Sequence, residues 1–141
     1  MPLIANWLGV IPADSECNDI VDFSDFLPTI CEAAGVTLPM LPNIDGRSFL
    51  PQLKGKKGNP RDWIYCWYSK GGKESDAKVF ARNQHYKLYR TGEFYDIQND
   101  VLEKKPLPKN DLDSDAEQIK AMLQNALNKY KDKRSSLLTG E

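Results

Sequence analysis

Apolar residues recur with a helical period close to the end of the chain. The repeat occupies every third or fourth position, at Ile119, Met122, Leu123, Ala126, Leu127 and Tyr130. Such a stripe predicts an amphipathic helix that packs on a sheet. Ser114 and Glu117 precede it with the Ser-x-x-Glu spacing of a capping box. We therefore expect a helix that begins near Ser114.

The tripeptide Phe-Leu-Pro occurs twice, at 26–28 and at 49–51. The preceding residues, Asp25 and Ser48, can each cap the free backbone N–H groups of a helix, whose first turn also tolerates proline. The first copy continues into a single apolar helical face formed by Leu27, Ile30, Cys31 and Ala34. Each segment ends on a glycine suited to a helix end, Gly35 in the first and Gly55 in the second. The pattern predicts a helix over Phe26–Ala34 and a shorter one from Phe49, rather than an internal repeat.

Short apolar runs predict the strands. Pro2–Trp7 is typical of a buried strand, and Asp62–Ser69 is apolar on both faces, as in a strand covered on both sides. Lys78–Arg82, Tyr86–Arg90 and Glu93–Ile97 follow at the spacing of an antiparallel meander. The expected fold class is α+β: a four-stranded antiparallel sheet with a C-terminal helix packed on it, preceded by a strand-loop-helix segment.

Composition narrows the function classes. The 141 residues carry a net charge of −1 with a pI near 5.9, so no long-range field favours nucleic acid. The basic residues within 54–57 and 129–134 are interpreted as parts of the solvent-exposed surface. No run approaches the roughly 20 apolar residues of a membrane span, and the first residues lack the basic start of a signal peptide.

The residue types that carry chemistry are few. Cys17, Cys31, Cys66 and the single histidine, His85, do not supply the clustered ligands of a zinc site. Cys31 and Cys66 are interpreted as small apolar side chains, and whether any two cysteines form a disulfide stays open. His85 falls in a predicted hairpin turn with no nucleophile at a suitable spacing. We identify no catalytic, cofactor-binding or metal-binding residue in this chain.

Three aspartates are spaced at intervals of three, at Asp19, Asp22 and Asp25. On a helix this spacing would place the carboxylates on one face. The alternative is a polar loop that ends in a helix cap at Asp25.

Five stretches occur in an order found in a known family. They are Pro2–Pro12, Val21–Gly35, Ile44–Gly55, Arg82–Tyr89 and Glu93–Leu107. Together they resemble the C-terminal third of the sulfatases, the sulfate-ester hydrolases of the alkaline phosphatase superfamily. Two departures are small: Leu8 stands where the family usually has proline, and Val101-Leu102 replaces the usual turn after Asp100.

The resemblance implies a large N-terminal α/β domain followed by a smaller subdomain. Residues 1–56 would be the tail end of the α/β domain, 57–132 the C-terminal subdomain and 133–141 a disordered tail. The family's nucleophile is a formylglycine made from a Cys/Ser-x-Pro-x-Arg motif, and calcium usually polarises the sulfate. In the family these residues lie upstream of the stretches matched here, and the motif does not occur in this sequence.

We therefore expect a C-terminal fragment that is inactive alone, from a sulfatase that is exported or periplasmic. Its partners would be the missing N-terminal sulfatase domain and a sulfated substrate, and residues 1–56 would self-associate in the isolated chain. The alternative is a stand-alone binding or interaction module derived from the subdomain.

Five residues are candidates to line a substrate pocket of the parent enzyme. They are Trp67, Tyr68, Lys70, Arg82 and His85. Cationic groups suit anionic sulfates, and aromatic faces suit sugar rings. Sheet packing and ordinary surface charge are the alternative explanation for each of them.

Overall fold

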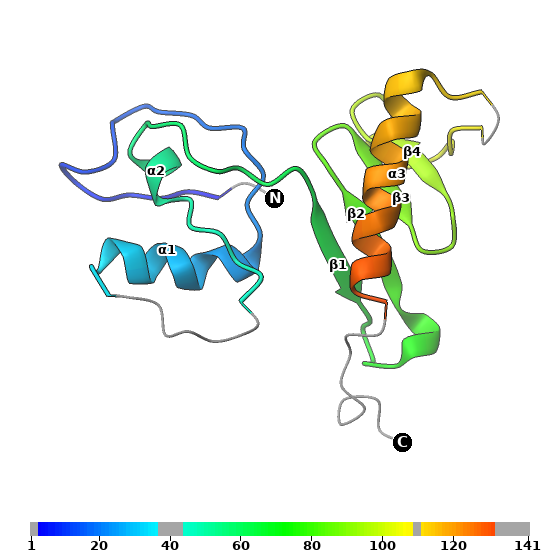
Figure 1. The fold of residues 1–141 in the computed structure, drawn as a ribbon, viewed down its shortest axis with the longest axis horizontal. Coiled ribbons are helices and arrows are strands. Elements are labelled where there is room, and N and C mark those ends of the chain that lie inside the picture. The colour runs from blue at the N-terminus through cyan, green and yellow to red at the C-terminus, as the bar shows by residue number, and fades with distance from the viewer. Residues whose placement is uncertain (1–2, 37–43, 109–110, 132–141) are drawn as a thin grey trace. The chain divides into compact units, whose positions relative to one another are not determined.

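The computed structural model describes residues 3–36, 44–108 and 111–131. These residues fall into two compact units, of which the first ends at Asp62 and the second begins at Trp63 (Figure 1). The tail expected at 133–141 lies outside the described residues.

The first unit contains helices and connecting segments. A 3-10 helix, η1 (Phe23–Asp25), leads directly into α1 (Phe26–Ala33), and α2 (Leu50–Leu53) is a single turn. The hydroxyl of Thr29 ties the two α-helices together, because it donates to Asp25 O (2.6 Å) and accepts from the Phe49 backbone N–H (3.0 Å). Gly46 passes so close that a Cβ there would lie 2.0 Å from Ser24 O. Only glycine fits this approach.

Two helix predictions are confirmed, with corrections to their caps. The carboxylate of Asp25 does not cap α1. Asp22 caps η1 instead, accepting from Ser24 N (2.9 Å), while Asp25 is buried. The Ser48 hydroxyl accepts from Leu50 N (3.2 Å), so α2 begins one residue later than expected.

The strand expected at Pro2–Trp7 is wrong for residues 3–7, which form no strand, and Pro2 lies outside the described residues. A strand requires a neighbour for its backbone hydrogen bonds. Among the described residues of the first unit no such neighbour exists. Apolar side chains of residues 3–12, together with Phe26, Phe49 and Leu53, instead line an open hollow.

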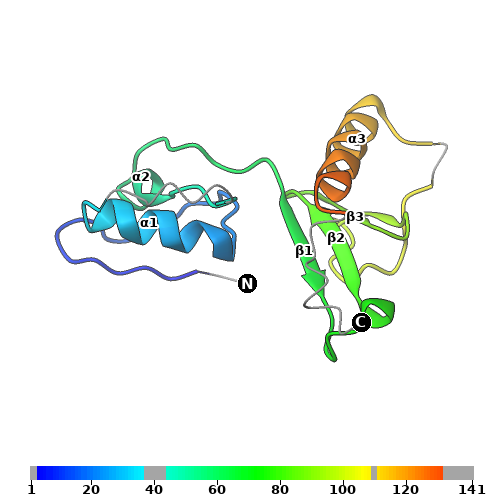
Figure 2. The ribbon, with the colours of Figure 1, turned by 60° about the horizontal axis from the view of Figure 1, so that its bottom comes forward.

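The second unit is an antiparallel sheet crossed by one helix. Its strands are β1 (Ile64–Tyr68), β2 (Lys78–Arg82), β3 (Tyr86–Tyr89) and β4 (Phe94–Asp96), in that spatial order, with a 3-10 turn, η2 (Glu74–Asp76), before β2. Helix α3 (Ser114–Lys129) lies across one side of the sheet (Figure 1, Figure 2). The predicted fold class of a four-stranded antiparallel sheet with a C-terminal helix is confirmed.

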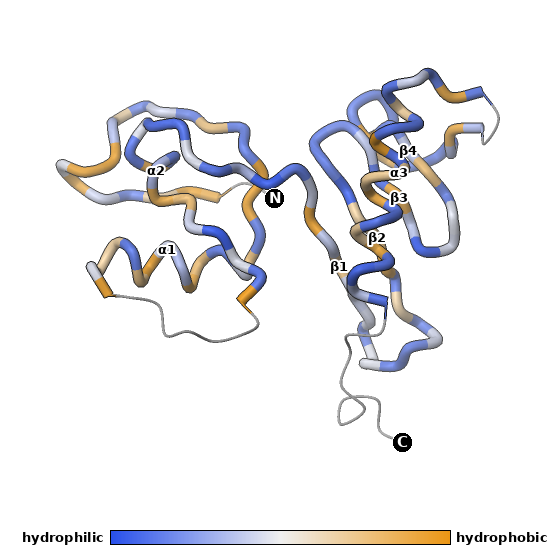
Figure 3. Tube along the Cα trace, in the orientation of Figure 1, coloured by the Kyte–Doolittle hydropathy of each residue, from blue (hydrophilic) through white to orange (hydrophobic). Residues whose placement is uncertain are grey.

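Helix α3 is capped one residue earlier than the sequence suggested. The carboxylate of Asp113, rather than the hydroxyl of Ser114, accepts from Ala116 N (2.7 Å). Apolar positions recur along α3 (Figure 3), and the predicted stripe that they form faces the sheet. The buried core joins both elements and consists of Val79, Ala81, Leu88, Phe94, Ala116, Leu123, Ala126 and Leu127.

Strand β1 presents different residues to the two sides of the sheet. Its register pairs Tyr65 with Ala81 and Trp67 with Val79, which places both aromatic rings on the side of α3. Tyr68 points to the other side and is 57% exposed. Ile64 and Cys66 on that side are partly buried, as Tyr65 and Trp67 are on the side of α3, so among the described residues of β1 only Tyr68 departs from the expectation of a strand covered on both sides. One helix can cover only one side of the sheet.

Candidate functional site

The five residues predicted to line a substrate pocket lie at opposite ends of the sheet. Trp67, Tyr68 and Lys70 are at the end of β1 and in the turn after it, where the register sets Tyr68 opposite the first residue of β2. Arg82 ends β2, and His85 lies in the hairpin that leads to β3. The structure thus brings the candidates together as two groups and not as one.

The group at the end of β1 includes two charged residues that the sequence analysis missed. Trp67 Nε1 donates to Glu74 Oε2 (3.1 Å), and Glu74 Oε1 forms an ion pair with Arg90 Nη1. Both charged side chains are about half exposed, at 52% and 46%, so the pair contributes little to stability. Glu74 thus joins an indole to a guanidinium, whereas the exposed phenol of Tyr68 points to the other side of the sheet and the exposed Lys70 lies in the following turn.

The group at the β2–β3 hairpin makes one contact to the backbone and one to another side chain. Arg82 Nε donates to Asn83 O (3.0 Å), and the exposed His85 has its Nε2 3.4 Å from Nε2 of Gln98. Hydrogen bonds from Asn99 hold the pKa of the neighbouring Asp96 carboxyl below its usual value. His85 lies in a solvated turn, as the sequence predicted.

A third cluster occupies the side of the sheet away from α3. Lys87 Nζ donates to Glu103 Oε1 (2.7 Å), the Tyr89 hydroxyl donates to Glu103 Oε2 (2.6 Å), and Lys87 Nζ lies 4.1 Å from the centroid of the Phe80 ring. Burial raises the pKa of Glu103, but the hydrogen bonds from Lys87 and Tyr89 outweigh it and hold that pKa below 4.5. The cluster pins the turn that precedes Pro106 onto the sheet.

The described residues contain no candidate metal site, because no three of their His, Cys, Asp or Glu side chains are close enough together to bind one ion. The three aspartates of the first unit do not converge, because Asp22 caps η1 and Asp25 binds an arginine. The described residues therefore do not fit the calcium site that the resemblance implies for the N-terminal domain. All three cysteines are free thiols. None of the described helices is long and apolar enough to cross a membrane.

Comparison with known proteins identifies the family. The family model described as "N-sulphoglucosamine sulphohydrolase, C-terminal" matches residues 1–133. An ulvan-active sulfatase from Formosa agariphila is 38% identical over 65 residues, which make up 46% of this chain and 13% of that protein. An N-acetylglucosamine-6-O-sulfatase from Bacteroides thetaiotaomicron is 28% identical over 94% of this chain and 25% of its own length.

A solved structure has the same fold. It is of a protein in complex with its substrate, D-glucosamine-2-N,6-O-disulfate, and it superimposes with a TM-score of 0.59 and 26% identity over 77% of this chain and 24% of its own. The chain spans a quarter or less of the length of these three proteins. It belongs to the sulfatases of the alkaline phosphatase superfamily, as a C-terminal domain of the N-sulphoglucosamine sulphohydrolase type.

Proposed function

We propose that this chain is the C-terminal part of a longer sulfatase that hydrolyses sulfate esters of glycans. The observation that carries the proposal is the family match over residues 1–133, on a fold that has the expected sheet and terminal helix. The names of two relatives refer to ulvan and to N-acetylglucosamine 6-O-sulfate, which supports a glycan substrate. An N-terminal domain would supply the formylglycine nucleophile and the divalent cation.

The described part of this chain would contribute a wall of the substrate pocket. The β1-end group offers the stronger chemistry, because Glu74 joins the indole of Trp67 to the guanidinium of Arg90, and the exposed cation Lys70 follows in the next turn. A charge-assisted hydrogen bond to a sulfate oxygen is the contact that such cations make best. Arg82 and His85, at the other end of the sheet, stay a second prediction for the same role.

The first unit would pack on the N-terminal domain. Three large apolar side chains at η1 and α1 are at least half exposed: Phe23 (80%), Leu27 (50%) and Ile30 (63%). Leu27 and Ile30 belong to the single apolar face that the sequence predicted for this helix. A partner domain that covers this face would remove its apolar area from water.

The experiment compares the chain alone with the chain joined to the protein encoded directly upstream of it. Release of sulfate is measured from 4-nitrophenyl sulfate and from D-glucosamine-2-N,6-O-disulfate. We expect turnover only by the joined protein, since binding energy from one subdomain cannot replace a missing nucleophile. Turnover by the chain alone would contradict this role. An upstream region with no frame encoding Cys/Ser-x-Pro-x-Arg would favour the stand-alone binding module.

A further inference from the structure

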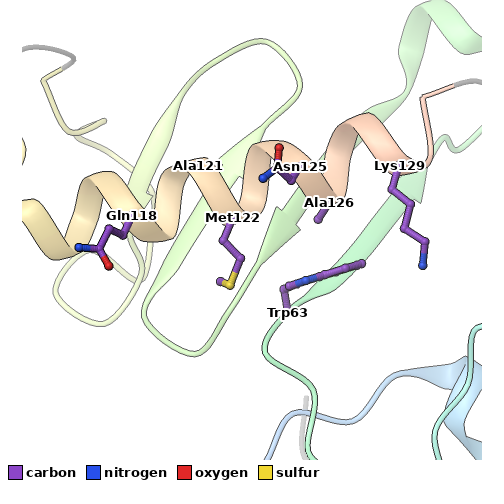
Figure 4. Close-up of a pocket in the computed structure, with 7 residues that line it drawn as sticks. All are labelled: Trp63, Gln118, Ala121, Met122, Asn125, Ala126 and Lys129. Carbon is purple, nitrogen blue, oxygen red and sulfur yellow. The ribbon is translucent and has the colours of Figure 1, made fainter.

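A groove runs along the side of α3 that faces Trp63 (Figure 4). Residues at positions 118, 122, 125 and 129 line it, at the spacing that places side chains on one face of a helix. Its volume is about 550 Å³. In Figure 4, Gln118, Met122 and Lys129 extend from α3 toward the side on which Trp63 lies.

The floor of the groove is apolar and is held in place by ring packing. Trp63 meets the ring of Tyr130 edge to face at 6.2 Å between centroids, and Tyr130 stacks on Tyr65 at 4.8 Å. Two alanines and Met122 complete the apolar lining. The indole is therefore fixed in orientation by two partly buried tyrosines while it still faces the groove.

The polar groups of the groove are amides and one cation. Gln118 and Asn125 carry carboxamides, which both donate and accept hydrogen bonds. Lys129 Nζ lies 5.9 Å from the centroid of the Trp63 ring and 4.9 Å from that of Tyr130. No carboxylate is among the described residues that line the groove. An apolar floor with few polar groups is typical of ligand sites, and here the only charge is positive.

We propose that this groove binds a sulfated sugar unit. The face of the indole suits the C–H side of a pyranose ring, the amides suit its hydroxyl groups, and the ammonium of Lys129 suits a sulfate. This inference rests on the proposed function, because that function is what supplies a sulfated glycan as the ligand. Charge complementarity with Lys129 favours this occupant over a neutral sugar.

The test measures binding by the full chain and needs no catalysis. D-Glucosamine-2-N,6-O-disulfate is titrated by calorimetry and by tryptophan fluorescence, with unsulfated D-glucosamine as the comparison. We expect the disulfate to bind and Lys129→Gln to weaken its binding about fivefold to tenfold. Lys131→Gln is the matched control: it removes the same charge from an exposed position outside the groove and should leave binding unchanged.

A second pair of variants avoids Trp63, which packs against the core and whose removal could unfold the unit. Ala121→Glu places a carboxylate inside the groove from an exposed position, whereas Gln124→Glu adds the same charge outside the lining. Only the former should abolish binding of the disulfate.

Three results would overturn the proposal. The first is equal binding of the sulfated and unsulfated sugars, and the second is equal loss in Lys129→Gln and Lys131→Gln. The third is the absence of any binding of the disulfate by the full chain. Because no sulfate release is measured, failure here is distinguishable from failure of the proposed enzyme function.

Discussion

The carboxylate of Asp25 accepts hydrogen bonds from the guanidinium of Arg61, which lies 36 residues further along the chain. Arg61 Nε is 2.7 Å from Oδ2 and 2.9 Å from Oδ1. The same carboxylate, 2% exposed, accepts the backbone N–H groups of Arg47 (2.7 Å) and Asp22 (2.8 Å). One buried side chain thus joins three separate segments of the first unit.

Replacement of this carboxylate should destabilise the first unit. In Asp25→Asn the charge is lost while Arg61, 10% exposed, stays buried without its counterion. Breaking such a pair typically costs about 3–5 kcal/mol, so we expect a loss of about 2–4 kcal/mol for this nearly isosteric change. Hydrogen exchange of the Arg47 amide reports the local loss directly. The control Asp62→Asn changes an exposed carboxylate and should shift stability by less than about 0.5 kcal/mol.

The pH dependence of the same variant follows from the direction of its pKa shift. Burial raises the pKa of Asp25, but the hydrogen bonds from Arg61, Arg47 and Asp22 outweigh it and bring that pKa below 3.8. A carboxyl with a lower pKa in the folded state stabilises the fold above its unfolded pKa, and this contribution is lost as the pH falls through the folded pKa. The stability difference between wild type and Asp25→Asn should therefore be constant from about pH 5 to pH 7 and shrink below about pH 4. Urea unfolding at a series of pH values measures it, and a difference that grows on acidification would contradict this explanation.

The sequence predicted the second unit better than the first. The strands over 78–82 and 86–89 and the stripe of α3 follow from local periodicity, and each finds its partner within this chain. The predicted strand at Pro2–Trp7 has no partner strand among the described residues of the first unit, so residues 3–7 do not form it. Periodicity shows which residues can form a strand, but not whether a neighbouring strand is present.

The ion pairs could not be predicted from the sequence, for a different reason. Asp25 was interpreted as a helix cap because it precedes Phe-Leu-Pro, yet its partner Arg61 lies 36 residues further along the chain. Glu103 and Lys87 are 16 residues apart on different elements. No local spacing reports such pairs, because they depend on how the segments fold back on one another.

The Lys87–Glu103 pair should show measurable coupling in a double-mutant cycle of Lys87→Met and Glu103→Gln. The two side chains are 12% and 25% exposed, so we expect about 0.5–1.5 kcal/mol after screening by solvent. The more exposed Arg90–Glu74 pair, treated in the same way, should show less than about 0.5 kcal/mol.

The pH window of this coupling follows from both partners. Burial lowers the pKa of Lys87, but the hydrogen bond to Glu103 outweighs it and raises that pKa above 10.5, whereas the pKa of Glu103 lies below 4.5. The coupling is therefore complete between about pH 5 and pH 10. It is lost as the pH falls through the folded pKa of Glu103 or rises through that of Lys87. Equal coupling at pH 2 and pH 7 would contradict the assignment.

Ile30→Lys should reduce self-association of the isolated chain without unfolding α1. Ile30 is 63% exposed within α1, and lysine is a good helix former, so the helix should keep its stability. Burial of an isoleucine in an interface contributes about 1.5–3 kcal/mol, which corresponds to at least a tenfold weaker association. Sedimentation velocity over a range of concentrations measures the shift.

Val101→Lys, which removes a 74% exposed apolar side chain from the second unit, is the matched control and should associate as the wild type does. If the wild-type chain sediments as a monomer throughout, or if both variants weaken association equally, the face formed by Phe23, Leu27 and Ile30 is not a surface through which the isolated chain self-associates.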